Sequence, residues 1–361
     1  MSKKIEEDQI FLTGLSDHLK FHYLRGKGHL FSYLWNRFQW YNYPKWQKVS
    51  RFPLHIDVEI SSVCNMKCPM CYTTTDIFKE KVDRGLMAFD LFKKIIDESA
   101  KYKLFSIRLS LRGEAFLNPH FIAMLKYAKD KGVKETSTLT NGLQLNEEIF
   151  EQLVDFGLDW LTISVDGWGE KYESIRKPAK FKETYQKIKN YAQIKKNKRS
   201  LKPVIKVQSI WPAIQEKPEY FYNTFKPYVE EVASNPLIDF LREDKNIQYI
   251  EDFTCAYLWQ RMSLGADGNV LMCQCDDMEE KILGNVKDDS IYDIWHGVEL
   301  NRIRDIHVQH KGPKILEPCK HCAYPRRTEA REEVGLDNRK VTVEKYTGKT
   351  NIISKIAGGD V

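Results

Sequence analysis

Three cysteines close together in the first quarter of the chain constrain it more than any other feature. Cys64, Cys68 and Cys71 share one short segment with the spacing C-x3-C-x2-C. Iron–sulfur clusters are normally held by four cysteines, so a local set of three leaves one iron of a cubane cluster without a protein ligand. The spacing therefore predicts a [4Fe–4S] cluster whose open iron binds a cofactor.

The alternative for this segment is a zinc site or three reduced cysteines in the core. A structural zinc ion needs a fourth ligand nearby, usually from a second C-x2-C or from a pair of histidines. No histidine occurs in the forty residues after Cys71. The segment therefore favours iron over zinc.

Length and charge set broad limits on the chain. Its 361 residues suffice for one large domain or two unequal ones. The 56 Lys and Arg against 50 Asp and Glu give a net charge of +6, which is too mild to indicate nucleic acid as a partner. No apolar run reaches the ~18 residues of a membrane span, and no secretory signal is present. We therefore expect a cytoplasmic protein whose cysteines bind metal.

Along residues 51–245, segments with the apolar alternation of a strand are followed by segments with the apolar spacing of a helix. This alternation predicts a parallel sheet with right-handed crossovers, and six units suit an open, partial (βα)6 barrel with its active site at the C-terminal ends of the strands. The predicted strands are 53–60, 104–111, 134–139, 159–165, 203–210 and 236–241. The predicted helices are 88–102, 119–131, 146–156, 179–196 and 217–232.

The regions outside the barrel differ in composition. Residues 1–50 hold 11 of the 44 aromatic residues, interleaved with Lys and Arg, which predicts one or two helices packed on the barrel, or a surface for a membrane or a partner. Residues 250–327 are cysteine-rich and contain an Asp-Gly turn typical of a hairpin, in the segment 264–271. Residues 328–361 form a polar tail that we expect to be partly disordered.

The cysteine segment follows the first predicted strand and is itself followed by Tyr72. In this arrangement it resembles the radical S-adenosylmethionine (radical SAM) superfamily. The resemblance implies that the methionyl end of S-adenosylmethionine chelates the open iron. It also implies reductive cleavage of that cofactor to a 5′-deoxyadenosyl radical, which abstracts a hydrogen atom from a substrate.

Further segments resemble cofactor-binding elements of that family. Gly113-Glu114 is similar to the Gly-Gly-Glu-Pro element that binds the methionyl ammonium, although Arg112 replaces the first glycine and Ala115 the proline. The resemblance implies contacts to the cofactor from the turns and strand ends that follow. The implied cofactor-binding residues are Tyr72, Gly113, Glu114, Asn141, Ser164, Arg176 and Gln208.

A second group of cysteines resembles the twitch extension, the shortened relative of the SPASM domain. The resemblance implies that four residues hold an auxiliary [4Fe–4S] cluster, namely Cys255, Cys273, Cys319 and Cys322. A zinc site with four cysteine ligands is the alternative. Cys275 is left over, and it is either a further core thiol, an alternative ligand to Cys273, or a hydrogen-atom donor in an epimerase.

Together these likenesses imply a radical SAM oxidoreductase with two [4Fe–4S] clusters that acts on a small polar substrate of the sugar or aminocyclitol type. The auxiliary cluster then accepts the second electron of a net oxidation. The alternatives are the epimerase, a maturase of ribosomal peptides, and a non-catalytic iron–sulfur or zinc protein. The expected electron donor is a low-potential protein such as flavodoxin or ferredoxin. The lack of an RNA-binding motif argues against nucleic acid.

Overall fold

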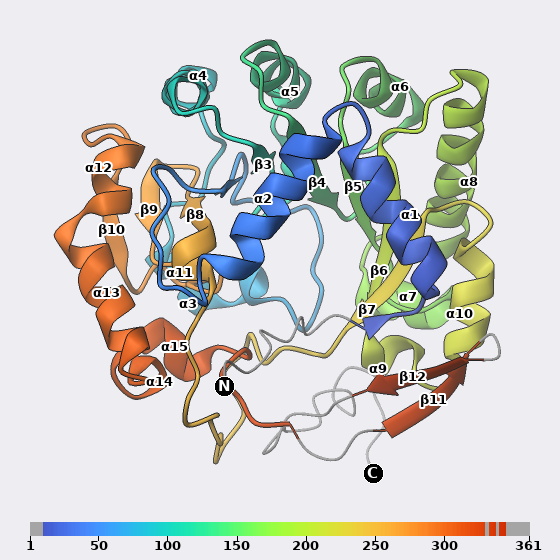
Figure 1. Ribbon diagram of the computed structural model, residues 1–361. Coiled ribbons are helices and arrows are strands. Elements are labelled where there is room, and N and C mark those ends of the chain that lie inside the picture. The colour runs from blue at the N-terminus through green and yellow to red at the C-terminus, as the bar shows by residue number, and fades with distance from the viewer. Residues whose placement is uncertain (1–9, 329–331, 337–338, 344–361) are drawn as a thin grey trace.

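The computed structural model describes residues 10–328, 332–336 and 339–343, and its centre is one ten-stranded sheet (Figure 1). Six parallel strands lie side by side in sequence order and confirm the open (βα)6 barrel. They are β2 (His55–Val58), β3 (Ser106–Arg108), β4 (Glu135–Thr140), β5 (Trp160–Ser164), β6 (Val204–Ile210) and β7 (Glu231–Asn235). A short strand, β1 (Ile10–Phe11), pairs antiparallel with β7 at one edge.

Helices cover the outer side of this sheet in an arc (Figure 1). They are α4 (Phe89–Lys101), α5 (Phe121–Asp130), α6 (Glu147–Asp155), α8 (Phe181–Asn197) and α10 (Pro218–Phe225). Each is amphipathic in the manner of α4, which buries Phe92, Ile95 and Ile96 at helical spacing. These helices match the predicted ones, apart from the end of the last.

The sixth barrel strand lies earlier than predicted. We expected a helix over 217–232 and a strand over 236–241, but the helix ends at Phe225 and β7 spans Glu231–Asn235. Pro227 explains the early end, because proline has no backbone N–H with which to continue the hydrogen bonds of the helix. Glu231 explains why the strand was missed, since a buried charge interrupts the apolar alternation.

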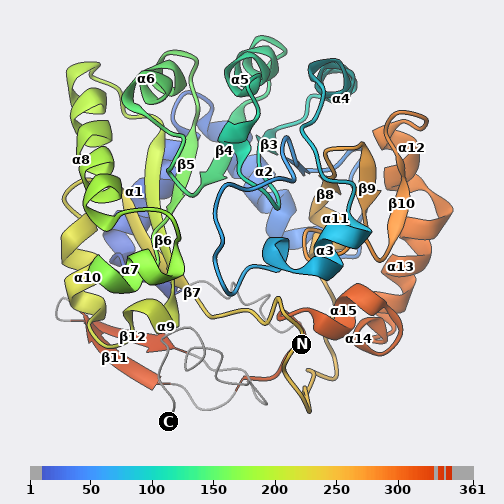
Figure 2. The ribbon, with the colours of Figure 1, turned by 180° about the vertical axis from the view of Figure 1, so that it is seen from behind.

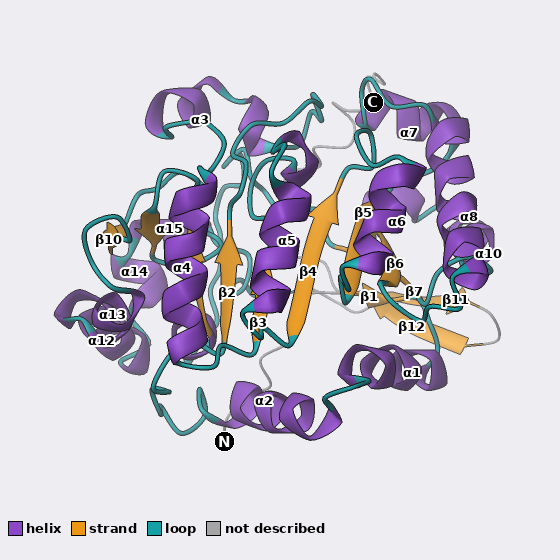
Figure 3. Cartoon of the chain, turned by 90° about the horizontal axis from the view of Figure 1, so that it is seen from above, coloured by secondary structure: helices purple, strands orange, loops and turns teal. Residues whose placement is uncertain are grey.

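The two ends of the barrel carry different elements (Figure 3). The short helices α3 (Asp76–Lys81) and α7 (Gly169–Ile175) lie at the C-terminal ends of the strands, and α1 (Leu15–Gly26) and α2 (Leu30–Asn42) lie at the opposite end. Asn36 donates a hydrogen bond to the carbonyl of Leu54 just before β2. Helices α1 and α2 therefore pack against the barrel, which is the first of the two alternatives for residues 1–50.

The cysteine-rich region continues the barrel sheet without interruption. β8 (Arg261–Leu264) pairs parallel with β2, and β9 (Asn269–Leu271) returns antiparallel as the predicted hairpin, followed by β10 (Ile282–Asn285). Short helices complete this side of the molecule (Figure 2). They are α11 (Tyr257–Gln260), α12 (Ile291–His296), α13 (Val298–Val308), α14 (Gly312–Ile315) and α15 (Glu317–His321).

The polar tail contains secondary structure in its described part. β11 (Glu332–Leu336) and β12 (Arg339–Val343) form an antiparallel pair within the tail that we expected to be partly disordered, and the rest of the tail after Thr328 lies outside the described residues. Leu336 and Val343 are buried, so alternating apolar residues anchor the pair. In the described part of the chain, no helix has the length and apolar character needed to cross a membrane.

Candidate active site

The cysteine loop, defined by Cys64, Cys68 and Cys71, follows β2 at the C-terminal end of the barrel strands. Cys68 is buried, Cys71 is half-buried and Cys64 is exposed. The amide of Cys71 donates to the carbonyl of Cys68 at 3.0 Å. Burial raises the pKa of Cys64 and raises that of Cys68 to about 11. Three thiols of graded exposure on one loop suit a cluster with one open side.

Gly113 brings the next strand end against the cysteine loop. A Cβ atom built on this residue would overlap the backbone carbonyls of Ser61 and Val63, so only glycine fits there. The next residue, Glu114, donates its amide to the carbonyl of Val63 at 2.8 Å. The predicted Gly-Glu element therefore packs directly on the loop.

Glu114 also joins the loop to the turn after β4. Its carboxylate accepts hydrogen bonds from the Thr140 hydroxyl at 2.6 Å and from the Asn141 amide at 2.7 Å. The side-chain amide of Asn141 donates to Asn65 at 2.8 Å and lies 3.8 Å from the Cys64 sulfur. Burial raises the pKa of Glu114, and these hydrogen bonds oppose that rise. Glu114 and Asn141 thus meet beside the cysteine loop, and their role toward the cofactor stays a prediction.

Arg176 approaches the loop from the segment after β5. Its guanidinium pairs with Asp166 at 2.6 Å, and Asp166 also accepts the amide of Ile210 at 2.9 Å. Asp166 and the nearby Cys68 thiol raise the pKa of Arg176 against the effect of burial. The amide of Lys67 in the loop donates to the carbonyl of Lys177 at 3.0 Å. The predicted arginine therefore lies next to the cysteines.

The remaining predicted cofactor residues are Tyr72, which directly follows Cys71, and Ser164 and Gln208 on the barrel strands. Ser164 and Gln208 are partners in the β5–β6 register, and Gln208 faces the barrel interior. The ring of Tyr72 contacts Phe78 and Phe240. Its hydroxyl bonds to Asp277. The structure thus places Tyr72 in an aromatic cluster, and its role toward the cofactor stays a prediction.

Arg112 has a structural role that the sequence did not reveal. Its guanidinium donates two hydrogen bonds to Glu59 after β2, at 2.6 and 2.5 Å, and one to Glu279 at 2.7 Å. All three side chains are nearly inaccessible. Arg112 therefore ties the barrel to the cysteine-rich region, which explains why it stands where the related motif has glycine.

The second group of cysteines lines one apolar pocket, the cysteine pocket. Its thiols are those of Cys255, Cys273, Cys275, Cys319 and Cys322. Hydrogen bonds with Cys273 and Cys322, followed by burial, raise the pKa of Cys275 well above its ordinary value. Burial likewise raises the pKa of Cys255 and of Cys319. This convergence brings the four predicted ligands together and adds Cys275 to them.

His307 is a pocket residue that sequence reasoning missed. Its Nε2 atom lies 3.5 Å from the Cys319 sulfur, and its Nδ1 atom is buried without a hydrogen-bond partner in the described part of the chain. Gly312 packs against the ring so closely that a Cβ atom would clash with it. A lone histidine on an amphipathic helix gives no sequence signal for this placement.

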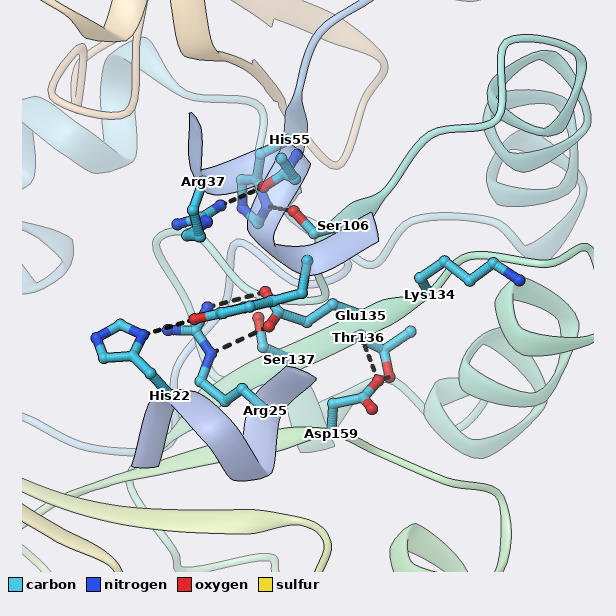
Figure 4. A network of polar contacts seen from close by, with 12 residues as sticks. His22, Arg25, Arg37, His55, Ser106, Lys134, Glu135, Thr136, Ser137 and Asp159 are labelled. Atoms are coloured by element: carbon cyan, nitrogen blue, oxygen red, sulfur yellow. Dashed lines mark hydrogen bonds and ion pairs between the residues drawn. The ribbon is translucent and has the colours of Figure 1, made fainter. Parts of the chain in front are cut away.

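The interior of the barrel holds a cavity of about 360 Å³ between the strands and helices α1 and α2. Arg25 on α1 donates two hydrogen bonds to Glu135 at the start of β4, at 3.0 and 2.9 Å (Figure 4). Other charged and basic side chains line the cavity, namely His18, His22, Arg37, His55, Arg108, Lys206, Glu231 and Arg261. Such a wall suits a polar ligand.

Two tyrosines separate this cavity from the cysteine pocket. Tyr257 and Tyr324 line both spaces, and their hydroxyl groups are 2.6 Å apart. The Arg261 guanidinium lies 4.4 Å from the centre of the Tyr257 ring, on the cavity side. A ligand in the barrel is thus separated from the cysteines by a single layer of side chains.

Two family models match the chain over these two regions. The radical SAM superfamily model matches residues 58–205, and the model described as an iron-sulfur cluster-binding domain, SPASM, matches residues 255–323. Residues 58–205 are thus a radical SAM domain, and residues 255–323 are a SPASM domain. The first match contains the cysteine loop with Gly113, Glu114, Asn141 and Arg176, and the second contains the cysteines of the pocket.

Curated relatives and solved structures resemble parts of this chain. A tungsten-containing aldehyde ferredoxin oxidoreductase cofactor-modifying protein of Pyrococcus furiosus is 33% identical over 115 residues, which are 31% of this chain and 30% of that protein. A probable GTP 3′,8-cyclase of Methanococcus maripaludis is 30% identical over 30% of this chain and 35% of its own length. The chain thus spans about a third of the length of the curated relatives it matches.

The structure of BtrN in complex with AdoMet and 2-DOIA has the same fold. The similarity covers 74% of this chain and 92% of BtrN, with a TM-score of 0.53 and 17% identity. SuiB of Streptococcus suis bound to S-adenosylmethionine gives a TM-score of 0.55 at 12% identity, over 81% of this chain and 77% of SuiB.

The two family domains imply S-adenosylmethionine and [4Fe–4S] clusters as cofactors, and the residues present fit them. Cys64, Cys68 and Cys71 of the cysteine loop would hold one cluster and leave one position for S-adenosylmethionine. The cysteine pocket offers enough thiols to ligate a second cluster fully. Membership in these families favours iron over zinc at both places and sets aside the non-catalytic protein.

Proposed function

We propose that this enzyme is a dehydrogenase that oxidises a small polar molecule bound in the barrel cavity. The observation that carries the proposal is the shared wall of Tyr257 and Tyr324 between the cavity and the cysteine pocket. An electron leaving a substrate in the cavity has only this layer to cross to reach a cluster in the pocket. That arrangement supports a net two-electron oxidation.

The electrons and atoms balance in this reaction. When bound, S-adenosylmethionine and its cluster supply the radical that removes one hydrogen atom from a substrate carbon. A cluster held by the cysteines of the pocket would accept one electron from the substrate radical, and a base or water would take one proton. A carbon that carries a hydroxyl group thereby becomes a carbonyl. A low-potential donor, for which flavodoxin or ferredoxin is our prediction, supplies the first electron.

The residues of the chain position these partners. Gly113, Glu114 and Asn141 hold the cysteine loop at the C-terminal end of the barrel. The cavity wall orients the substrate below that end, and proximity of this kind lowers the barrier of a bimolecular step. Helices α1 and α2 cover the opposite end of the barrel, which limits access of water to the reacting carbon.

The size of the cavity supports a small substrate over a peptide. About 360 Å³ lies in the range of sites for small molecules. Its charged and hydrogen-bonding wall favours sugars, aminocyclitols and similar polar metabolites. The likeness to SuiB concerns the fold alone and does not indicate a peptide substrate. The alternative, a maturase of ribosomal peptides, is tested by measuring whether the protein binds peptides.

An epimerase with Cys275 as hydrogen-atom donor is the second candidate. Its thiol would have to reach the substrate radical, yet Cys275 lines the cysteine pocket and bonds to Cys273 and Cys322. These contacts favour a role as cluster ligand or cluster neighbour. The variant Cys275→Ala decides the point: an epimerase would lose its inverted product and still cleave S-adenosylmethionine.

The proposed function is tested with enzyme reconstituted anaerobically with iron and sulfide. The protein is given dithionite and S-adenosylmethionine with a panel of sugars, aminocyclitols and related polar metabolites. We expect 5′-deoxyadenosine together with one carbonyl product per cofactor cleaved. Cleavage coupled to a product of unchanged oxidation state, or to a modified peptide alone, would overturn the dehydrogenase assignment.

A further inference from the structure

The charges around the barrel cavity do not balance. Each carboxylate of its wall already has a cationic partner: Glu135 binds Arg25, and Glu231 lies 3.7 Å from Lys206. Asp57, behind the wall, is shared by Arg108 at 2.9 Å and Arg261 at 3.4 Å. Each of these carboxylates is therefore already neutralised by a cationic side chain of the protein.

Arg37 on α2 is the cation left over. No carboxylate of the described residues lies within ion-pair distance of its guanidinium, which donates a hydrogen bond to the Asn36 side chain at 2.5 Å. Its Nε atom is buried without a hydrogen-bond partner among the described residues. Burial and the neighbouring Arg25 lower the pKa of Arg37. A bound anion would relieve both effects.

The guanidinium of Arg261 is only partly satisfied: its Nη1 atom lies 3.4 Å from Asp57 and donates a hydrogen bond to Gln274 at 2.8 Å. Its Nε atom is likewise buried and unbonded in the described part of the chain. The guanidinium carbons of Arg37 and Arg261 lie 4.5 and 4.7 Å from the centre of the same Trp40 ring. Both side chains line the barrel cavity. Trp40 therefore holds two cationic groups in one corner of the cavity, next to Tyr257.

We propose that this corner, formed by Arg37, Trp40 and Arg261, binds an anionic group of the substrate, either a carboxylate or a phosphate. Guanidinium groups recognise both anions through paired, charge-assisted hydrogen bonds. The inference rests on the proposed function in that it names the class of molecule the cavity accepts. It places the anion near the N-terminal end of the barrel, away from the cysteine loop.

The test is equilibrium binding of inorganic phosphate and of acetate, measured by ligand-observed nuclear magnetic resonance without S-adenosylmethionine. We expect saturable binding to the wild-type protein. Arg37→Gln should weaken it by about tenfold or more, as for one lost hydrogen bond to a charged group. The two probes separate a preference for phosphate from one for carboxylate.

Two controls keep this test sharp. Lys27→Gln removes an exposed cation of the same region and should leave binding unchanged, and Arg37→Lys should restore part of it. Thermal unfolding verifies that each variant is folded. Absence of saturable binding, or equal binding by Arg37→Gln, would overturn the anion site. Turnover of a neutral polyol in that case would leave the dehydrogenase proposal intact.

A different observation carries a second proposal, on the outer side of α1 and α2. Large apolar side chains are exposed there in a group that we name the aromatic face. Phe31 is 89% exposed, and Trp35 and Trp46 are 58% and 57% exposed. The full set is Leu15, Leu19, Tyr23, Leu30, Phe31, Leu34, Trp35, Phe38, Tyr41 and Trp46. Patches of this kind mark interaction sites.

The charges around the aromatic face are mostly positive. Residues 12–50 contain a single carboxylate, Asp17, and it pairs with Lys226 at 3.6 Å. Exposed cations surround the apolar side chains, namely Lys20, Lys27, Lys45 and Lys48. The loops that enter β3, β4 and β6 add exposed cations at the same end of the barrel, namely Lys103, Lys134 and Arg199.

We propose that the aromatic face rests on the surface of a bilayer that contains anionic lipids. Tryptophan, tyrosine and phenylalanine favour the interfacial zone of a bilayer, and lysine and arginine attract anionic headgroups. Helices α1 and α2 lie side by side across the end of the barrel (Figure 3), so both can lie along one plane. The cofactor end of the barrel would then face away from the membrane.

Co-sedimentation with vesicles tests this docking. The full chain should pellet with vesicles of equal parts phosphatidylglycerol and phosphatidylcholine, and not with phosphatidylcholine alone. The double variant Phe31→Ser/Trp35→Ser should lose most of the bound fraction. The matched control is Ile315→Ser, which removes a 51% exposed apolar side chain on α14, and it should bind like the wild type.

The competing occupant of this face is a second copy of the chain. Light scattering of the same variants distinguishes the two. A dimer that the double variant dissociates, with no vesicle binding by the wild type, would overturn the membrane proposal. Equal binding of the wild type and the double variant would also overturn it.

Discussion

The cysteine loop and the cysteine pocket collect sulfur ligands in opposite ways. The loop takes Cys64, Cys68 and Cys71 from eight consecutive residues and leaves Cys64 exposed. The pocket gathers cysteines from segments up to 67 positions apart, from Cys255 to Cys322, among apolar side chains. The loop is built to share its cluster with a cofactor, and the pocket is built to enclose one.

This difference divides the chemistry between two places. An open cluster can bind and cleave S-adenosylmethionine, whereas a fully ligated cluster in an apolar surrounding is suited to electron transfer. The wall of Tyr257 and Tyr324 keeps the pocket within one layer of side chains of the substrate cavity. In the proposed oxidation, the cluster of the loop would receive the first electron and the cluster of the pocket would accept the last.

The largest effect is expected from removing the loop thiols. The variant Cys64→Ala/Cys68→Ala/Cys71→Ala should lose all cleavage of S-adenosylmethionine, because no site remains for the open iron. Its iron content should fall from about eight to about four per chain, since the pocket keeps its cluster. Iron analysis and 5′-deoxyadenosine chromatography measure both. Retained cleavage would contradict the division between the two groups.

Removing pocket thiols should separate cleavage from oxidation. In Cys255→Ala/Cys319→Ala we expect 5′-deoxyadenosine to form still, while the carbonyl product of the substrate disappears. The reason is that the substrate radical lacks its electron acceptor. The measurement is the ratio of product to 5′-deoxyadenosine. An unchanged ratio would mean that the pocket takes no part in the oxidation.

Arg112 joins the two regions, and its loss should destabilise both. Arg112→Met leaves Glu59 and Glu279 buried without their partner, which costs about 3–5 kcal/mol of unfolding free energy. The matched control is Arg302→Met, whose exposed pair with Glu299 contributes about 0–1 kcal/mol. Denaturant unfolding compares them. Equal stability of the two variants would contradict the structural role of Arg112.

A smaller effect confined to the loop side is expected from Gly113→Ala. The added methyl group overlaps the carbonyls of Ser61 and Val63, and overpacking of this kind costs about 1–3 kcal/mol. Cofactor cleavage should slow while the pocket cluster stays intact. Gly85→Ala is the control, because nothing lies within 4 Å of the added atom. Similar stability and activity of both variants would argue against the close approach.

The surroundings of the cysteine loop could be predicted well from the sequence, because the motifs that form them are short and local. A cysteine spacing, a Gly-Glu pair and an Asn-Gly turn each follow a strand, and parallel strands bring their ends together. The structure accordingly places Glu114, Asn141 and Arg176 around the loop. Strand β7 was misplaced because buried Glu231 interrupts its apolar pattern.

The features that escaped prediction depend on contacts between distant segments. Arg112 pairs with Glu59, 53 positions before it, and with Glu279, 167 positions after it. The residues next to Arg112 in the sequence give no sign of these partners. Tyr257 and Tyr324 come to lie between the two cavities only when distant segments of the chain fold together. His307 and the cationic corner at Arg37 likewise arise from the assembled fold.

The measurement that tests the account most directly is electron paramagnetic resonance of the reduced protein, with and without S-adenosylmethionine. We expect the cofactor to change the signal of one cluster only. That change should persist in Cys255→Ala/Cys319→Ala and vanish in Cys64→Ala/Cys68→Ala/Cys71→Ala. A cofactor-induced change in the loop variant would contradict the central claim that the loop alone binds S-adenosylmethionine and the pocket encloses a separate cluster.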